Sequence, residues 1–277
     1  MTGTALLTEG GRIRLKWHRL RDAADRASHD RASLAEGLAR GALLEVDLQL
    51  TGDSHWVCLH DATLEAETTG RGPVAGASRR AIEGLRQRHQ DGRELPDPPL
   101  FLDELAERLA ASTTGARLQL DLKLDRRTLD GPARARFAAA VAPLAERFDL
   151  GGEDWPLVQE LAALAPGILP GFETWPLALG GRLADRGAAE RFAEAMVEAA
   201  PEAAILYIHY RLIPEAASFG VDLVGTAHGH GHEVDAWTID PGLPGLGGLL
   251  RHLAEAGCDQ ITTNAPTALE AIWQRSS

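Results

Sequence analysis

The sequence of 277 residues has little cysteine, few aromatic side chains and no excess of basic residues. Its two cysteines, Cys58 and Cys258, stand far apart, which excludes zinc sites of the Cys-x-x-Cys kind and predicts two buried thiols in a reduced compartment. Aromatic residues make up only 5%, and alanine and leucine dominate, which favours amphipathic helices over an all-β chain. The formal net charge of -12 argues against a nucleic-acid partner, because binding phosphates needs clustered lysine and arginine.

Long apolar runs are missing as well. No segment approaches the roughly 20 apolar residues of a transmembrane helix, and residues 1–16 contain no apolar run that is typical of a signal peptide. We therefore expect a cytoplasmic protein without stable membrane association. No G-x-G-x-x-G motif follows the first predicted strand, so a dinucleotide-binding fold lacks its strongest signal. Nothing in the sequence indicates an oligomeric state.

Strand-like and helix-like segments alternate almost throughout the chain. The expected strands are residues 12–18, 43–50, 55–60, 117–124, 148–150, 168–172, 204–210, 233–239 and 258–263. The expected helices are residues 32–40, 100–111, 133–147, 157–164, 188–198, 221–230, 246–256 and 266–274. This order predicts a parallel sheet covered by helices. With residues 55–60 counted as an extension of the second strand, eight strands and eight helices predict an α/β fold, a (β/α)8 TIM barrel that forms a single domain over residues 1–277.

The stretch 61–99 interrupts this alternation. It is rich in glycine, proline, threonine and charged residues, and it contains one short helix-like segment around residues 79–88. Long connections of this kind are usually functional or carry a small subdomain. We interpret it as a small insertion after the second strand, at the catalytic mouth of the barrel.

Three acidic residues stand inside or beside apolar strands. Glu45 and Asp47 are two residues apart, so a strand directs them to the same face, and Asp121 lies in the next predicted parallel strand. Adjacent like charges on a buried face are costly unless a cation binds them. Three carboxylates from neighbouring strands suit a hard cation, Mg²⁺ or Ca²⁺, better than zinc.

Two histidines and two basic residues lie near the carboxyl ends of the same predicted strands, where barrel enzymes place their active sites. His18 and His60 come from different strands, and two histidines can divide the work of general base and general acid. Arg19 and Lys123 supply fixed positive charge for phosphate oxygens. The alternative is structural: the acids pair with Lys123 and Arg19 in a buried ion network.

Other polar patterns favour structural roles. The alternating histidines of residues 228–232 fit the end of a helix that Gly231 terminates. Residues 28–30, Ser-His-Asp, lack the strand-turn-helix context of a nucleophile elbow and predict a polar loop. His209 and Tyr210 end the sixth predicted strand and are candidates for lining the pocket.

Taken together, these motifs resemble the glycerophosphodiester phosphodiesterases. That family has His-Arg near the N-terminus, then Glu-x-Asp, His-Asp after a short strand, Glu-x-Lys, Trp-Thr, and a late Thr-Asp-x-Pro stretch. This chain carries, in the same order, His18-Arg19, Glu45-Val46-Asp47, His60-Asp61, Asp121-Leu122-Lys123, Trp237-Thr238 and Thr263-Asn264-Ala265-Pro266. It departs from the family pattern at Leu20, where the family has glycine, at residues 30–33, where it has Glu-Asn-Thr, and at Asp121, where it has glutamate.

The resemblance implies a TIM barrel that hydrolyses glycerophosphodiesters to sn-glycerol 3-phosphate and an alcohol such as choline or ethanolamine. It implies one divalent cation, Mg²⁺ or Ca²⁺, held by Glu45, Asp47 and Asp121. It also implies His18 and His60 as the acid/base pair. The substrate-binding set that it implies is Arg19, Lys123 and Trp237.

Three alternatives remain open from the sequence. The same chemistry occurs in lysophospholipase D and sphingomyelinase D-like enzymes, which also use two histidines and a metal on a barrel. A non-catalytic barrel that binds phosphorylated metabolites is a candidate from another class. A different barrel enzyme, such as an enolase-type lyase, would need acids on later strands, where few occur.

Overall fold

Strands and helices alternate along the chain as the sequence predicts, and a computed structural model describes residues 2–178 and 181–276. The chain forms two compact units. The central unit comprises Arg19–Leu169, and the terminal unit comprises the residues up to His18 and from Pro170 onward.

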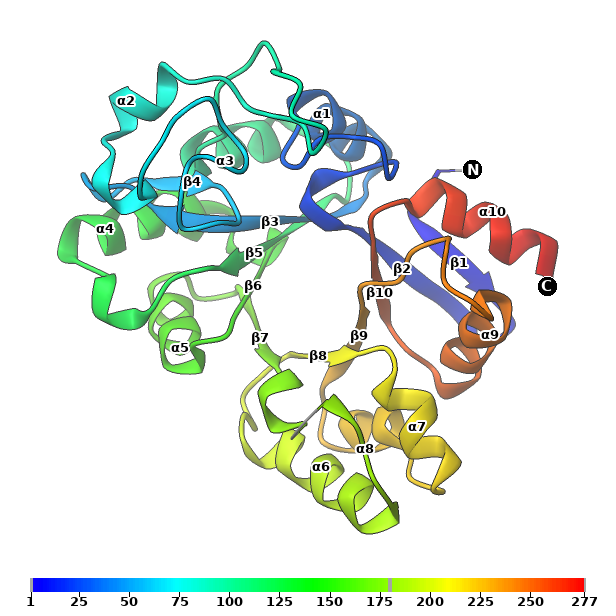
Figure 1. The fold of residues 1–277 in the computed structure, drawn as a ribbon. Coiled ribbons are helices and arrows are strands. Elements are labelled where there is room, and N and C mark those ends of the chain that lie inside the picture. The colour runs from blue at the N-terminus through cyan, green and yellow to red at the C-terminus, as the bar shows by residue number, and fades with distance from the viewer. Residues whose placement is uncertain (1, 179–180, 277) are drawn as a thin grey trace. The chain divides into compact units, whose positions relative to one another are not determined.

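The sheet of the central unit has the strand order β6-β5-β3-β4. Its strands are β3 (Leu43–Leu50), β4 (Trp56–Cys58), β5 (Arg117–Leu122) and β6 (Phe148–Gly152). Its helices are α1 (Arg31–Arg40), α2 (Arg79–Glu83), α3 (Leu102–Ala111), α4 (Gly131–Val141) and α5 (Trp155–Leu164). Strands β3, β5 and β6 are parallel, and α4 and α5 pack against each other beside them (Figure 1). Every residue of β3 is buried, as its run of leucine and valine predicts.

Strand β4 turns back along β3, so residues 55–60 do not extend the second strand as we expected. Leu48 pairs with Cys58 and Leu50 with Trp56 in antiparallel register. The turn between the two strands contains Ser54 at φ 64°, in the left-handed region. Because β4 runs backward, the residues that follow it return toward the middle of β3.

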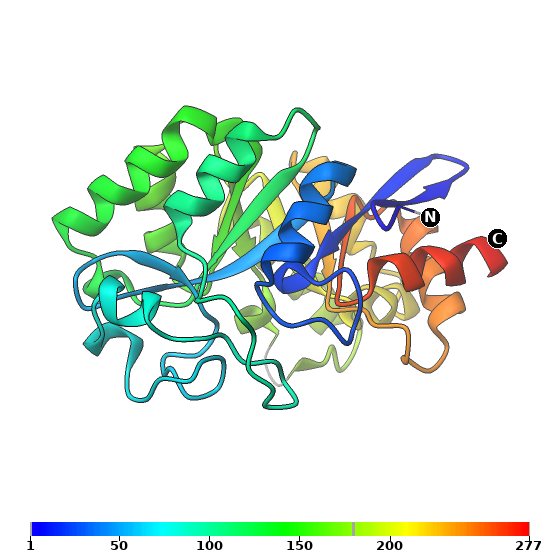
Figure 2. The same ribbon diagram turned by 90° about the horizontal axis from the view of Figure 1, so that it is seen from above.

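The stretch 61–99 follows β4 and forms a group of loops with one short helix (Figure 2). It packs on β4 through a small apolar core of its own. It contains the short helix α2 and the 3₁₀ turn Val74–Gly76. The buried side chains of this core are Val57, Leu59, Leu64, Val74, Ile82 and Phe101. The helix-like segment predicted over residues 79–88 is shorter than expected, because α2 ends at Glu83 before Gly84.

The sheet of the terminal unit has the strand order β1-β2-β10-β9-β8-β7. Its strands are β1 (Ala5–Thr8), β2 (Gly11–Trp17), β7 (Leu169–Glu173), β8 (Ile205–His209), β9 (Glu233–Trp237) and β10 (Gln260–Thr263). Its helices are α6 (Arg186–Glu198), α7 (Leu212–Ser218), α8 (Leu223–Gly229), α9 (Leu246–Ala256) and α10 (Pro266–Ser276). β1 pairs antiparallel with β2, and α10 lies beside this hairpin (Figures 1 and 2). The pairs β2–β10, β10–β9, β9–β8 and β8–β7 are parallel. The indole of Trp273 on α10 donates to the carbonyl of Leu7 at 2.7 Å.

A buried polar network lies on one face of this second sheet. Lys16 and Asp235 are fully buried and form an ion pair. Thr262 donates to Asp235 at 3.0 Å, and the Lys16 ammonium lies 4.8 Å from the centre of the Tyr207 ring. A Cβ at Gly171 would lie 2.5 Å from that ring, so this position on β7 requires glycine.

Five parallel strands of the terminal unit and three of the central unit give the eight strands of the predicted (β/α)8 barrel. The single domain over residues 1–277 stays a prediction. Among residues 2–178 and 181–276, no helix is both long and apolar enough to cross a membrane.

Candidate functional site

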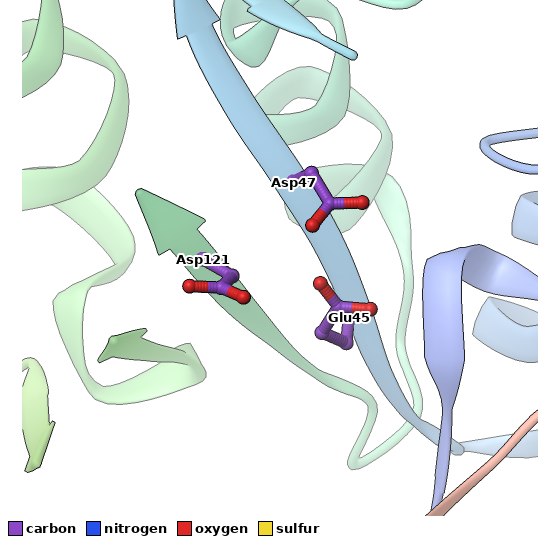
Figure 3. Close-up of side chains that lie close together, drawn as sticks. All are labelled: Glu45, Asp47 and Asp121. Atoms are coloured by element: carbon purple, nitrogen blue, oxygen red, sulfur yellow. The ribbon is translucent and has the colours of Figure 1, made fainter. Parts of the chain in front are cut away.

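Three carboxylates meet on the sheet of the central unit (Figure 3). Glu45 and Asp47 share one face of β3 because they are two residues apart, and Asp121 on β5 is the register partner of Asp47. One oxygen from each carboxylate lies within 4.8 Å of the others. Glu45 is 3% exposed and Asp47 is 1% exposed. The predicted clustering of these acids is therefore present in the structure.

The surroundings of this cluster shift the pKa values of the three acids in different directions. Burial, together with the charges of Asp47 and Asp121, raises the pKa of Glu45 well above its usual value. Burial also raises the pKa of Asp121, although Lys123 opposes the shift. At Asp47 burial alone would raise the pKa, but the hydrogen bond from His29 and the charges of His29, Arg19 and Lys123 outweigh it and hold the pKa well below its usual range.

Arg19 and Lys123 flank the cluster. The Arg19 side chain lies 3.0 Å from Asp47 Oδ2, and its backbone N–H donates to Glu45 Oε2 at 2.7 Å. Arg19 and Leu20 both adopt left-handed φ angles, 53° and 62°, so Leu20 takes the conformation that glycine would favour. Lys123 lies 2.7 Å from Asp121 and 3.3 Å from Asp47, and these carboxylates raise its pKa although burial opposes the shift.

These residues fit a hard divalent cation. All three donors are carboxylate oxygens, which Mg²⁺ and Ca²⁺ prefer. The ion network that we considered as an alternative does exist, because Arg19 and Lys123 pair with Asp47. Burial, together with the neighbouring acids, nevertheless keeps the pKa values of Glu45 and Asp121 raised, so their charged forms stay disfavoured. A bound cation would favour those charged forms. As metal ligands, the three acids stay a prediction.

His60 also lies in the central unit, where the backward course of β4 brings it toward β3. Its carbonyl accepts a hydrogen bond from Gln49 at 3.0 Å, and its Nδ1 lies 2.7 Å from Asp61 Oδ1. A carboxylate accepts at this distance, so Nδ1 carries the proton and Nε2 is the nitrogen that is left to exchange one with a ligand.

His18 lies in the terminal unit, directly after β2. Its Nδ1 is 2.8 Å from Asn264 Oδ1, and the Asn264 side-chain amide donates to Asp240 at 2.9 Å. Because that amide is a donor toward Asp240, Asn264 Oδ1 accepts from His18, and His18 Nδ1 carries its proton. The late motif Thr263-Asn264-Ala265-Pro266 thus orients the first histidine of the predicted pair.

Trp237 ends β9 in the terminal unit and packs with aromatic neighbours. Its ring centre lies 5.0 Å from that of His209, and Trp175 lies 4.5 Å from His209. Burial, followed by the charge of Arg211, lowers the pKa of His209 to about 4, so His209 is neutral at pH 7. His209 therefore has two aromatic neighbours, Trp175 and Trp237. That His209 lines a pocket and that Trp237 binds substrate both stay predictions.

The structural interpretation of the alternating histidines is confirmed. His228 pairs with Asp259 at 2.9 Å, His230 lies 2.9 Å from the carbonyl of Thr226, and His232 is buried against the carbonyl of Ala203. Their partners are therefore side-chain and backbone oxygens of the helix end and the neighbouring loops.

Sequence reasoning missed two residues that contact the site. His29, which we placed in a polar loop, does lie in a loop, but its Nε2 is 3.3 Å from Asp47 Oδ2. Glu67 accepts the backbone N–H of His60 at 2.6 Å. The first contact joins a loop to strand β3, and the second joins two residues that are seven apart in the sequence. Neither residue belongs to a spacing pattern that would have indicated it.

Comparison with known proteins gives the same assignment as the motifs. The model of the glycerophosphoryl diester phosphodiesterase family matches residues 23–141. A search of the curated proteins finds no match.

Among solved structures, a Silicibacter pomeroyi protein provisionally named a glycerophosphoryl diester phosphodiesterase is 22% identical, with a TM-score of 0.71 over 95% of this chain and 93% of that one. A glycerophosphodiester phosphodiesterase from Agrobacterium tumefaciens is 20% identical, with a TM-score of 0.67 over 96% of this chain and 100% of that one. An Oleispira antarctica phosphodiesterase, solved in complex with sn-glycerol-3-phosphate, is 19% identical, with a TM-score of 0.67 over 94% and 96%.

These similarities confirm the (β/α)8 TIM-barrel fold and the family resemblance that the motifs predict. Residues 23–141 match the model of the glycerophosphoryl diester phosphodiesterase family, and the chain as a whole shares the fold of solved structures that carry that name.

Proposed function

We propose that this protein is a divalent-metal-dependent glycerophosphodiester phosphodiesterase, which hydrolyses its substrate to sn-glycerol 3-phosphate and an alcohol. The observation that carries the proposal is the cluster of Glu45, Asp47 and Asp121 within 4.8 Å, flanked by Arg19 and Lys123. The family match over residues 23–141 supports the reaction class. The Oleispira antarctica structure, which has this fold and holds sn-glycerol-3-phosphate, supports the product.

The charged residues account for the phosphate end of the substrate. When bound by Glu45, Asp47 and Asp121, Mg²⁺ or Ca²⁺ would neutralise charge on the phosphate and on the transition state. Arg19 and Lys123 would hold phosphate oxygens, and both lie against the acid cluster already. These positive charges allow an acidic protein to take an anionic substrate.

The two histidines account for proton transfer. A glycerol hydroxyl attacks phosphorus, one histidine takes its proton, and the other protonates the oxygen of the departing alcohol. This gives a cyclic phosphate and the free alcohol. Water then opens the cyclic phosphate with the two histidines in exchanged roles. Asp61 and Asn264 hold His60 and His18, respectively, in the tautomer with the proton on Nδ1, so that Nε2 exchanges the proton in each case.

Turnover of a defined diester tests this proposal. The purified protein, with Mg²⁺ or Ca²⁺, is incubated with glycerophosphocholine, and sn-glycerol 3-phosphate is measured by a coupled dehydrogenase assay. We expect metal-dependent release that EDTA abolishes. Absence of release from a panel of diesters, although the protein binds the cation, would refute the proposal and favour a phosphate-binding barrel. Faster turnover of lysophosphatidylcholine or sphingomyelin would favour the lysophospholipase D or sphingomyelinase D-like alternative.

A cytoplasmic location and a role in glycerol and lipid metabolism are part of the proposal. Cys58 and Cys258 are both free and buried, which is compatible with a reducing compartment. The proposed partner is a small-molecule phosphodiester, with no nucleic acid and no stable membrane association.

A further inference from the structure

Glu67 lies between two groups of the candidate site. Its Oε2 accepts the backbone N–H of His60 at 2.6 Å, and its Oε1 lies 3.8 Å from His29 Nδ1. The side chain is only 16% exposed. It belongs to the stretch 61–99, outside every motif that the sequence analysis singled out.

His29 continues the same line of contacts to the acid cluster. It is 1% exposed, and its Nε2 lies 3.2 Å from the backbone N of Asp47 and 3.3 Å from Asp47 Oδ2. Nδ1, the other nitrogen of the ring, faces Glu67 at 3.8 Å. The backbone of His29 is fixed as well, since its N–H donates to the Arg19 carbonyl at 2.8 Å and its φ is 55°.

Glu67 is not needed to anchor the loop in which it lies. The apolar core around Leu64 and Ile82 already attaches this stretch to β4. The buried Thr68 hydroxyl donates to the carbonyl of Leu64 at 2.7 Å, and the backbone carbonyl of Glu67 accepts from Arg88 at 2.7 Å. A half-buried carboxylate is costly to place, so its contact with the residue proposed to move protons requires another explanation.

We infer that Glu67 is a positioning residue for His60, and that His29 extends this link to Asp47. The four residues form a line from the proposed acid/base group to the proposed metal ligand, entirely within the central unit. A hydrogen bond from a backbone N–H to a carboxylate is among the stronger kinds, and it fixes the main chain at His60. The inference rests on the proposed function, because it takes the roles of His60 and Asp47 from there.

The first test separates positioning from folding. Glu67→Ala removes the acceptor and should lower kcat by about 10- to 100-fold while KM changes by less than about 3-fold, since small misplacements of a catalytic group cost about that much. Glu67→Gln keeps an oxygen that can accept the His60 N–H and should restore most of kcat. Glu65→Ala is the matched control, because Glu65 lies in the same stretch and accepts the backbone N–H of Gly72 at 2.7 Å. It should keep the wild-type kcat.

The second test needs no turnover. Hydrogen exchange over the peptide that contains His60 should be faster in Glu67→Ala, and unchanged in Glu67→Gln and Glu65→Ala. His29→Asn tolerates the left-handed backbone but is too short to reach Asp47. It should weaken Mg²⁺ or Ca²⁺ binding by about 10- to 100-fold in calorimetric titration, as loss of a group that orients a ligand does.

The outcomes are distinct. Wild-type exchange at His60 in Glu67→Ala, or equal losses in Glu67→Ala and Glu65→Ala, would overturn the role of Glu67. Unchanged cation affinity in His29→Asn would overturn the link to Asp47. If the wild-type protein released no glycerol 3-phosphate, the proposed function would fail, while the exchange and titration results would still decide whether these contacts position His60 and Asp47.

Discussion

Replacing Glu45 by glutamine should stabilise the protein without metal and weaken its response to metal. Glutamine keeps the shape and the acceptor for the Arg19 N–H, which donates to Glu45 Oε2 at 2.7 Å, but it removes one charge from the cluster. Two like charges 4.8 Å apart repel by about 3 kcal/mol at an effective dielectric constant of about 20. Burial and the charges of Asp47 and Asp121 disfavour the charged form of Glu45, as its raised pKa indicates, and the charge of Lys123 offsets part of this cost.

The net gain expected in EDTA is therefore about 1 to 2 kcal/mol, or a Tm higher by about 2 to 8 °C. With a saturating cation, the wild-type protein should be more stable than Glu45→Gln. At 100 times its Kd the cation adds about 2.7 kcal/mol to the wild-type protein, whereas Glu45→Gln has lost a ligand and gains little. Thermal unfolding by differential scanning calorimetry, in EDTA and then with Mg²⁺ or Ca²⁺, measures both effects.

The pH dependence of this effect has a definite sign. Glu45 and Asp121 have pKa values raised by folding, so the stability linked to them is greatest below about pH 4 and is lost as the pH rises through their raised values. The advantage of Glu45→Gln in EDTA should therefore be larger at pH 7 than at pH 5. Asp47, whose pKa is lowered, acts in the opposite direction, and only below about pH 4.

Asp149→Asn is the matched control. Asp149 on β6 is equally buried, but it is paired with Arg117 rather than with other acids. Removing its charge should lower Tm both in EDTA and with the cation. If Glu45→Gln lowered Tm in EDTA, or kept the full wild-type response to the cation, the electrostatic account of the cluster would be wrong.

Three further changes test other parts of the structure. His18→Ala and His60→Ala should each lower kcat by about 10²- to 10⁴-fold and keep the rise in Tm with the cation; full activity in either variant would refute its role. Lys123→Met removes the ammonium 2.7 Å from Asp121 and should lower kcat/KM by about 10²-fold and lower Tm in EDTA; an unchanged kcat/KM would exclude Lys123 from phosphate binding. Gly171→Ala places a methyl group against the Tyr207 ring and should cost about 1 to 3 kcal/mol in urea unfolding. Gly248→Ala, with open space at its Cβ on a helix, is its control and should not destabilise.

Residue periodicity predicted the parts of the fold that repeat regularly. The bounds of β3 and α9 match the expected ranges, because a continuous buried run and an amphipathic pattern are strong signals. The meeting of Glu45 and Asp121 followed from alternation on β3 and from parallel pairing with the next strand. No more than strand geometry was needed for this part of the site.

Short elements and loop contacts were not predictable in the same way. Strand β1 has four residues, and helix α7 has seven and contains Pro214, so each spans only about two periods of its pattern, too few for a clear signal. The reversal of β4 depends on the turn at Ser54, which adopts a left-handed φ that serine seldom takes. His29 and Glu67 meet through the tertiary path of two loops, which no local spacing encodes.

Because β4 runs backward along β3, the number of residues between Leu50 and His60 determines where the His60 side chain lies. Each residue added to this stretch would shift the chain by about 3.3 Å and, by one step in an antiparallel pair, turn every following side chain to the opposite side. His60 would then leave its place beside Gln49. Insertions and deletions among active relatives should therefore be tolerated beyond Glu67 and avoided between Leu50 and His60, so the length of this hairpin is itself a marker of an active enzyme.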